Sequence, residues 1–414
     1  MFRPSVRRWL PEIASLCLVT IVSCVPGEAA EPRPVELTSP LPYGPAPIHY
    51  FSEDEDDPIK QVQARLDGGS LSFQTKGDSG YLLDLLQALK IDVESQTLVF
   101  SRTSINQALV KPASPRAIYF DDDVTVGWVP AAAAIEIALQ DPVKGTIFYT
   151  LPQPTGLPAP KPNEPPSIRF RRDGRCTACH ISGRTLHVPG HIVGSFLTDS
   201  IGQPREGYSS INHATPLNQR WGGWYVSGFA PNLIHWGNLV GQADTSRHRR
   251  DSSFRGALED LTSLVDLSRY PTRHSDAVAL LVLNHQLQFY NLVNRVSFEH
   301  RLQRRSDAEE RLVAYALMND EAPLAGPLRG TTKFAEIYQA RGPRDETGRS
   351  LSTLDLQSRL FRFNLSPLIT SHSFRSLPDE VRLRLYQRMD IELAKREDQA
   401  AREIARAIIS DWPE

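Results

Sequence analysis

One cysteine pair constrains this chain of 414 residues more than any other feature of its sequence. Cys176 and Cys179 are separated by two residues and followed directly by His180, whereas Cys17 and Cys24 lie in the N-terminal segment. A C-x-x-C-H pattern is typical of c-type haem attachment. The two thiols add to the two vinyl groups of haem, and the histidine coordinates the iron. We therefore expect one covalent haem c, bound through Cys176, Cys179 and His180.

Other uses of the cysteine pair agree less well with the sequence. A structural zinc site would need a second pair of ligands, and no cysteine follows Cys179. A thioredoxin-like redox site would not need His180 and would lie within a βαβ pattern, which does not surround this motif. A structural disulfide also leaves the histidine unexplained. No Ser-His-Asp pattern, P-loop or H-E-x-x-H motif indicates a different chemistry.

The first thirty residues have the features of an export signal, which fits the attachment of haem outside the cytoplasm. Three arginines precede an apolar stretch, residues 13–23, that is too short to span a bilayer. Two cleavage sites for this signal remain possible. Residues 21–24 resemble a bacterial lipobox, which would make Cys24 a lipidated N-terminus, whereas residues 27–29 suit ordinary signal peptidase. We favour the lipoprotein, and expect a protein of the periplasm or outer cell envelope.

Composition and periodicity divide the chain into parts and favour an α+β fold. The N-terminal part mixes α and β and has a small sheet, the haem segment is loop-rich, and the C-terminal part is mainly helical. The expected parts are a signal peptide (1–30), a Pro-rich acidic spacer (31–57), an α+β region (58–150), a Pro-rich connector (151–166), a haem c attachment segment (167–240) and a helical region completing the haem pocket (241–414). Strands are expected at 97–101, 117–120, 125–129, 135–138 and 146–149, and helices at 80–91, 275–305, 308–318, 332–340, 355–361 and 379–409.

Arginines surround the motif and offer partners for the two haem propionates. Arg guanidinium groups pair well with carboxylates, so at least one of these side chains is a candidate for that contact. Arg172 and Arg175 are favoured because they precede the first cysteine most closely. A solvated basic loop is the alternative interpretation.

The sixth ligand of the iron is a choice among histidines, because only Met318 and Met389 follow the first residue as methionines. His285 is favoured, since it lies centrally on the expected helix 275–305 with apolar residues one turn away on both sides. A core histidine bonded to a nearby polar group is an equally simple interpretation. His235 and then His213 are the next candidates, and a vacant sixth position is a further alternative.

Four stretches give the chain a resemblance to a known group. Residues 114–128, residues 220–228, His285-Gln286 and residues 377–393 resemble large bacterial single-haem c-type cytochromes, a group of cytochrome c domain-containing proteins with one C-x-x-C-H and no assigned activity. The resemblance implies one architecture built around one haem. No catalytic residue can be carried over from the group to this chain, whereas a similar His-Gln pair in the group favours His285 as a ligand.

Function is expected to follow from the haem. Electron transfer with a periplasmic or membrane redox partner is favoured, because one haem occurs without a flavin motif or a second metal cluster. A peroxidase-like haem enzyme or a haem-based ligand-binding or sensory envelope protein is the alternative, and catalysis is not the favoured expectation. The formal net charge of −2 and the lack of a basic stripe argue against nucleic-acid binding.

Overall fold

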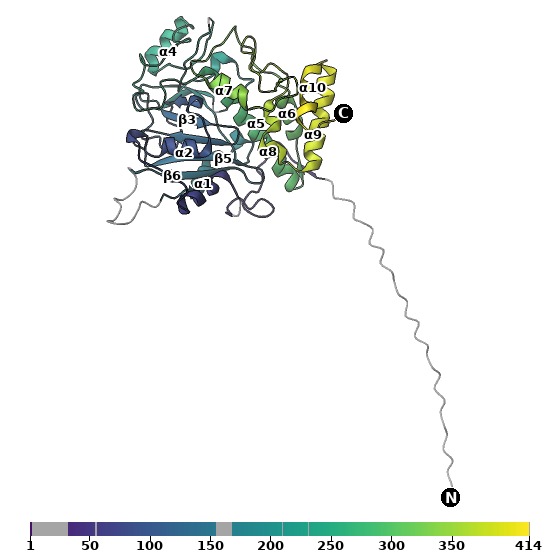
Figure 1. Ribbon diagram of the computed structural model, residues 1–414. Helices are drawn as coiled ribbons and strands as arrows, with labels where there is room; N and C mark the ends of the chain where they lie inside the picture. The colour runs from purple at the N-terminus through teal and green to yellow at the C-terminus, as the bar shows by residue number, and fades with distance from the viewer. Residues whose placement is uncertain (2–31, 54–55, 155–167, 209, 231, 414) are drawn as a thin grey trace.

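The computed structural model describes residues 1, 32–53, 56–154, 168–208, 210–230 and 232–413 (Figure 1). The expected export signal, with Cys24, and most of the connector 151–166 lie outside the described residues. The described part has an α+β fold, as the sequence predicted, with an antiparallel sheet and a helical C-terminal part.

A seven-stranded antiparallel sheet forms the centre of the fold, in the order β10-β2-β3-β4-β5-β6-β7. Five of its strands lie where the sequence predicted them: β2 (Thr97–Val99), β3 (Arg116–Phe120), β4 (Val124–Trp128), β5 (Ala134–Asp141) and β6 (Gly145–Pro152). The two edge strands, β7 (Arg171–Arg172) and β10 (Trp224–Tyr225), come from the haem segment. The α+β region and the haem segment therefore share one sheet. Two-residue strands carry no detectable periodicity, so the sequence did not predict them.

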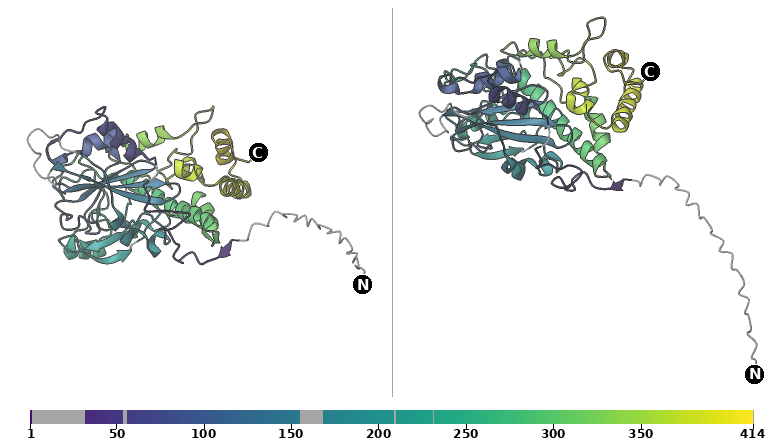
Figure 2. Two further views of the ribbon diagram at one scale, coloured as in Figure 1. Left: turned by 90° about the horizontal axis from the view of Figure 1, so that it is seen from below. Right: turned by 60° about the horizontal axis from the view of Figure 1, so that its bottom comes forward.

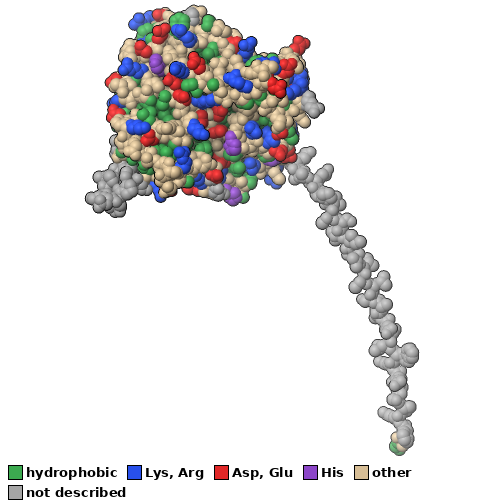
Figure 3. Space-filling model, in the orientation of Figure 1, with side chains coloured by type: hydrophobic (Ala, Val, Ile, Leu, Met, Phe, Trp, Pro, Cys, Tyr) green, Lys and Arg blue, Asp and Glu red, His purple; other side chains and the backbone are tan. Residues whose placement is uncertain are grey.

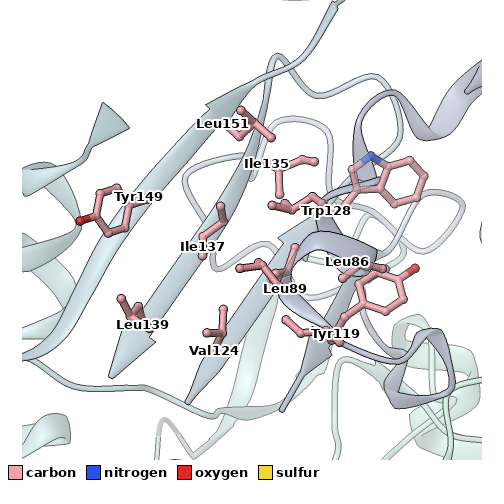
Figure 4. Packing of buried hydrophobic residues seen from close by; sticks show 14 of the residues in the cluster. Leu86, Leu89, Tyr119, Val124, Trp128, Ile135, Ile137, Leu139, Tyr149 and Leu151 are labelled. Atoms are coloured by element: carbon pink, nitrogen blue, oxygen red, sulfur yellow. The ribbon is translucent and has the colours of Figure 1, made fainter. Parts of the chain in front are cut away.

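One face of the sheet is apolar and is covered by two short helices. Alternate residues of β5 and β6, among them Ile135, Ile137 and Tyr149, point to this first face, as the two-residue period of a strand requires (Figure 4). Helices α1 (Pro58–Asp67) and α2 (Leu82–Leu89) pack on it with Ile59 and Leu86 (Figure 2). The Asp57 side chain caps α1 by accepting from two backbone N–H groups.

The second face of the sheet divides into two areas. Around β3, Ile118 and Phe120 pack in one apolar cluster with residues 277–283 of the long helix α5 (Ala277–Arg301). On β5 and β6 this face carries polar side chains, among them Glu136 and Gln140, beside the apolar Ala138 and Phe148. The C-x-x-C-H motif lies against this second area, where the His180 ring is 4.7 Å from the Phe148 ring.

The helical part differs in detail from the prediction. Besides α5 it contains α6 (Ala308–Ala316), α7 (Phe334–Arg341), α8 (His372–Arg375), α9 (Asp379–Lys395) and α10 (Gln399–Ile408). Residues 379–409 thus form two helices, separated at Glu397, whose φ is +57°. The prediction of a helix at 355–361 is wrong. The Asp355 side chain accepts hydrogen bonds from the backbone N–H groups of Gln357 and Ser358, which forms a turn there. Helix α4 (Gly241–Arg250) was not predicted.

The described part of the expected spacer 31–57 is packed against the body of the protein. Leu41, Ile48 and Tyr50 are buried, and the Tyr50 hydroxyl donates to the Thr146 carbonyl at 3.0 Å. Strand β1 (Arg33–Pro34) pairs in parallel with β11 (Arg304–Arg305), while β8 (Ser195–Thr198) and β9 (Pro204–Tyr208) form a separate hairpin. The proline content suggested a spacer, but the apolar residues of this segment give it buried contacts with the body.

Positively and negatively charged side chains are interspersed on the face of the protein that Figure 3 shows. Among the described residues, every helix is too short or too polar to cross a membrane.

Partly buried carboxyl groups at the turn between β3 and β4 predict a pH effect on stability. Burial raises the pKa of Asp121 to about 6, and burial together with the charges of Asp121 and Asp122 raises that of Asp123 to about 7. The stabilising contribution of such a group is complete below its unfolded pKa and is lost as the pH rises through its folded pKa. Asp123→Asn should therefore raise the free energy of unfolding by about 1–2 kcal/mol more at pH 8 than at pH 5.

Chemical denaturation at the two pH values measures this difference. The exposed Asp320, replaced in Asp320→Asn, is the matched control and should show no such dependence. An equal effect of Asp123→Asn at both pH values would contradict the assignment of a raised pKa to this carboxyl group.

Candidate functional site

The C-x-x-C-H motif forms one tight turn that presents both thiols on the same side. Asp173 caps a 3-10 turn, Gly174–Cys176, which continues into the single helical turn α3 (Thr177–His180). Residues three apart on a helix lie on one face, so Cys176 and Cys179 are neighbours. Both are free thiols, Cys176 half-buried and Cys179 exposed. No group of three or more His, Cys, Asp or Glu side chains converges as a metal site in the described part of the chain.

Burial acts on the first thiol of the pair. It raises the pKa of Cys176 to about 12, with further contributions from the charges of Asp173 and Glu136. The Cys176 side chain is therefore a neutral thiol at physiological pH, the form in which an S–H adds across a vinyl group.

The imidazole of His180 is held in one tautomer. Its Nδ1 lies 2.8 Å from the carbonyl oxygen of Gly190, and only a protonated Nδ1 can donate to a carbonyl. Burial lowers the pKa of His180, which keeps the ring neutral and leaves the lone pair on Nε2. Metal-binding histidines commonly donate their second ring nitrogen to a carbonyl in this way, which fixes the ring and makes the ligand more basic.

The Gly190 carbonyl is fixed by long-range contacts. Positive φ angles at Leu186 and His187 turn the chain back after the motif, and Gly190 N–H donates to the His180 carbonyl at 3.0 Å. Asn291 of α5 then accepts from His191 N–H (2.8 Å) and donates to the His191 carbonyl (2.9 Å). Helix α5 therefore positions the acceptor that orients His180.

A side chain at position 190 should disturb this arrangement. A Cβ atom there would collide with Oδ1 of Asn291 and lie 3.0 Å from Cβ of Thr185. We expect Gly190→Ala to lower the free energy of unfolding of the protein by about 1–3 kcal/mol, because well-packed interiors resist added volume. Denaturant titration measures the change. Gly44→Ala, whose new Cβ would find its nearest neighbour at 3.8 Å, is the control, and equal stabilities of the two variants would contradict the packing at Gly190.

A partly buried ion pair lies on the sheet beneath the motif. Arg116 of β3 and Glu136 of β5 are 2.6 Å apart, and the Asn106 amide donates to the second Glu136 oxygen at 2.7 Å. The Arg116 guanidinium lies over Gly127, where any Cβ would collide with it. The charges of both Arg116 and Glu136 act on Cys176, and that of Arg116 also acts on His180. The sequence did not predict this pair, since its two members are twenty residues apart and meet only through strand register.

The two arginines favoured as propionate partners have other contacts. Arg172 donates to the Tyr50 carbonyl at 2.8 Å, and its guanidinium lies 5.4 Å from the centre of the Tyr50 ring. Arg175 forms a two-pronged pair with Asp173 (2.9 and 2.6 Å), and 80% of its side chain is exposed. Arg172 is thus part of the packing around β7, while Arg175 remains at the surface beside the motif.

His285 belongs to a closed chain of hydrogen bonds. His213 Nε2 lies 3.2 Å from the Asn319 carbonyl, so this nitrogen carries the proton and His213 Nδ1 is an acceptor. His285 Nδ1 must then donate to His213 Nδ1 (2.9 Å), and His285 Nε2 accepts from the Ser366 hydroxyl (2.7 Å). Burial lowers the pKa of both rings, that of His213 to about 3, which keeps them neutral.

Helical geometry also separates His285 from the motif. Asn294 faces the motif segment, since its amide donates to the Pro189 carbonyl at 2.9 Å. His285 precedes Asn294 by nine residues, which places the two side chains about 180° apart around the helix axis at 3.6 residues per turn. His285 instead stacks on Tyr315 of α6 at 5.1 Å. In this conformation both ring nitrogens of His285 are bonded on the side of α5 opposite to the motif, so ligation of the iron by His285 stays a prediction that would require a different conformation.

The other histidine candidates are also used within the protein. His213 is the partner of His285, and His235 is fully buried with its Nε2 2.7 Å from the Gly256 carbonyl. His191 follows the Gly190 carbonyl directly, on the Nδ1 side of His180. The structure thus brings together Cys176, Cys179 and His180, with Arg175 beside them, and does not bring His285, His235 or His213 to them.

Comparisons with known proteins add no relative: no protein-family model matches the chain, and no curated protein or solved structure is significantly similar to it.

Proposed function

We propose that this protein is a c-type cytochrome with one haem c, attached through Cys176 and Cys179 and coordinated by Nε2 of His180. The observation that carries the proposal is the contact between His180 Nδ1 and the Gly190 carbonyl, which leaves Nε2 with its lone pair beside two free thiols. A bound haem would supply a one-electron iron centre. The chain contributes two thioether positions, a fixed proximal imidazole and, at Arg175, an exposed cation for a propionate.

Electron transfer in the cell envelope is the activity that this site supports best. Cys179 is exposed, so a haem attached to it has an edge near the surface, where a redox partner can approach. Reversible reduction tests the proposal: the haem-loaded protein should show one reduction step with isosbestic spectra. Irreversible loss of the haem spectrum on reduction and reoxidation would exclude an electron-transfer role.

Haem-based ligand binding is the second candidate function. It is favoured by one observation, the engagement of His285, His213 and His235 in contacts away from the motif. Addition of carbon monoxide to the reduced protein separates the two functions, because a carrier with two protein ligands binds it slowly, if at all.

We also propose that the protein is exported and anchored by a lipid at Cys24. The proposal rests on the sequence alone, from the basic start and the lipobox-like residues 21–24. Mass spectrometry of the membrane fraction should find a diacylglyceryl cysteine at the mature N-terminus, and Cys24→Ser should release the protein into the soluble fraction. A wild-type protein that is soluble and begins near Ala30 would contradict lipidation and leave export by ordinary signal peptidase.

A further inference from the structure

We infer that Arg116, oriented by Glu136, faces the iron position opposite His180 and stabilises a small anionic ligand bound there. This inference rests on the proposed haem attachment and on the second candidate function, haem-based ligand binding, which it extends. Under this inference the sixth position of the haem iron can exchange its ligand, and side chains of the sheet line that position.

Strand register gives the direction in which His180 Nε2 points. Three residue pairs follow one another along the second face of β5 and β6: Gln140 with Thr146, Ala138 with Phe148, and Glu136 with Thr150. The segment with Gly190 lies at the first pair, since Thr146 N–H donates to the Pro189 carbonyl at 3.1 Å. The His180 ring lies at the second pair, 4.7 Å from Phe148. Because Nδ1 is turned to Gly190, Nε2 points away from the Gly190 segment, and the charge of Arg116 acts on this ring.

The Arg116 guanidinium lies at this third residue pair, Glu136 with Thr150, and one of its hydrogen-bond donors is unused among the described residues. One terminal nitrogen of its guanidinium is paired with Glu136, whereas its buried Nε has no hydrogen-bond partner among the described residues. An unpaired buried donor is costly, and a bound anion would satisfy it with a charge-assisted hydrogen bond. The pairing with Glu136 and the close fit over Gly127 keep the guanidinium in place.

The segment that carries Asn106 also has two exposed apolar side chains. Ile105 and Leu109 are 53% and 39% exposed, and they flank Asn106, whose amide is bonded to Glu136. Exposed branched side chains at this place offer a macrocycle edge the apolar contact that a protein surface otherwise lacks.

Within the described ranges, Met318, Met389 and the three favoured histidines have contacts away from the sixth position. Met318 and Met389 are buried in the apolar clusters around α5 and α9, and residues 155–167, which adjoin the site in sequence, contain neither histidine nor methionine. The histidines best placed by sequence are bonded elsewhere or lie on the Nδ1 side of His180. A small exogenous anion therefore has access to the iron, with Arg116 as its hydrogen-bond donor.

Cyanide titration of the full-length, haem-loaded ferric protein tests the inference, with the Soret band as readout. We expect saturable binding to the wild type and an apparent Kd at least about tenfold weaker in Arg116→Gln, since a hydrogen bond to a charged group is lost. Carbon monoxide, a neutral probe of the reduced protein, should bind the two proteins with affinities within about threefold. Arg249→Gln, which removes an exposed arginine paired with Glu206, is the control and should bind cyanide like the wild type.

Two further arms keep the test decisive. If Arg116→Gln folds poorly because Glu136 is left unpaired, Arg116→Gln/Glu136→Gln removes both charges and should show the same loss of cyanide affinity. Covalent haem is measured first on the denatured chain, and its absence would overturn the proposed function itself. If haem is retained, three results would overturn this inference alone. They are no cyanide binding, equal cyanide affinities of wild type and variant, or an equal loss of affinity for cyanide and for carbon monoxide in the variant.

Discussion

Replacing Cys176 and Cys179 together by serine should abolish covalent haem while the rest of the protein still folds. Serine has nearly the shape of cysteine but cannot form a thioether, so no bond to the vinyl groups remains. Cys179 is exposed and Cys176 only half-buried, and neither belongs to an apolar cluster. We expect the apoprotein stability to change by about 1 kcal/mol or less. Haem staining of the denatured chain measures the loss.

Ala178→Ser is the matched control, because it alters an exposed position between the two cysteines without removing a thiol. It should retain haem like the wild type. Covalent haem in the double serine variant would place the attachment elsewhere, and loss of haem in Ala178→Ser would indicate that maturation is sensitive to the intervening residues.

His285→Ala should destabilise the protein strongly and leave its haem spectrum unchanged. The substitution opens a cavity beneath Tyr315 and removes the partners of His213 Nδ1 and the Ser366 hydroxyl, all of them buried. Loss of volume and unsatisfied polar groups together should lower the free energy of unfolding by about 2–4 kcal/mol. Denaturant titration and absorption spectra of the same sample measure the two properties.

His372→Ala provides the comparison, since His372 is an exposed histidine of the helical part and should tolerate the change. The opposite result for His285→Ala is a low-spin wild type that becomes high-spin and gains rapid carbon monoxide binding. That outcome would restore His285 as the sixth ligand and require a different conformation around α5.

Long periodic segments were predicted well from the sequence. The alternation of β5 and β6 and the apolar pattern of α5 each fix a secondary structure locally, and all of them appear near the expected positions. The break between α9 and α10 escaped prediction, because Glu397 adopts a left-handed conformation that no glycine or proline signals.

The site could be predicted only where its residues are adjacent in the chain. Cys176, Cys179 and His180 form a local motif, whereas Asn291, Gly190 and the Arg116–Glu136 pair act through contacts made by folding. His285 illustrates the limit of pattern reasoning: an imidazole within an apolar helix suits an iron ligand and a buried hydrogen-bond chain equally. Its partners His213 and Ser366 are 72 and 81 residues away, so the sequence alone could not distinguish these roles.

The mass of the denatured wild-type protein, produced by export in a host that matures c-type cytochromes, tests the central claim most directly. We expect a chain heavier by one haem, with haem retained through acid-acetone extraction and no free thiol at Cys176 or Cys179. Two results would contradict covalent attachment of haem. One is a chain of apoprotein mass whose two thiols are free or joined as a disulfide, and the other is haem that extracts completely.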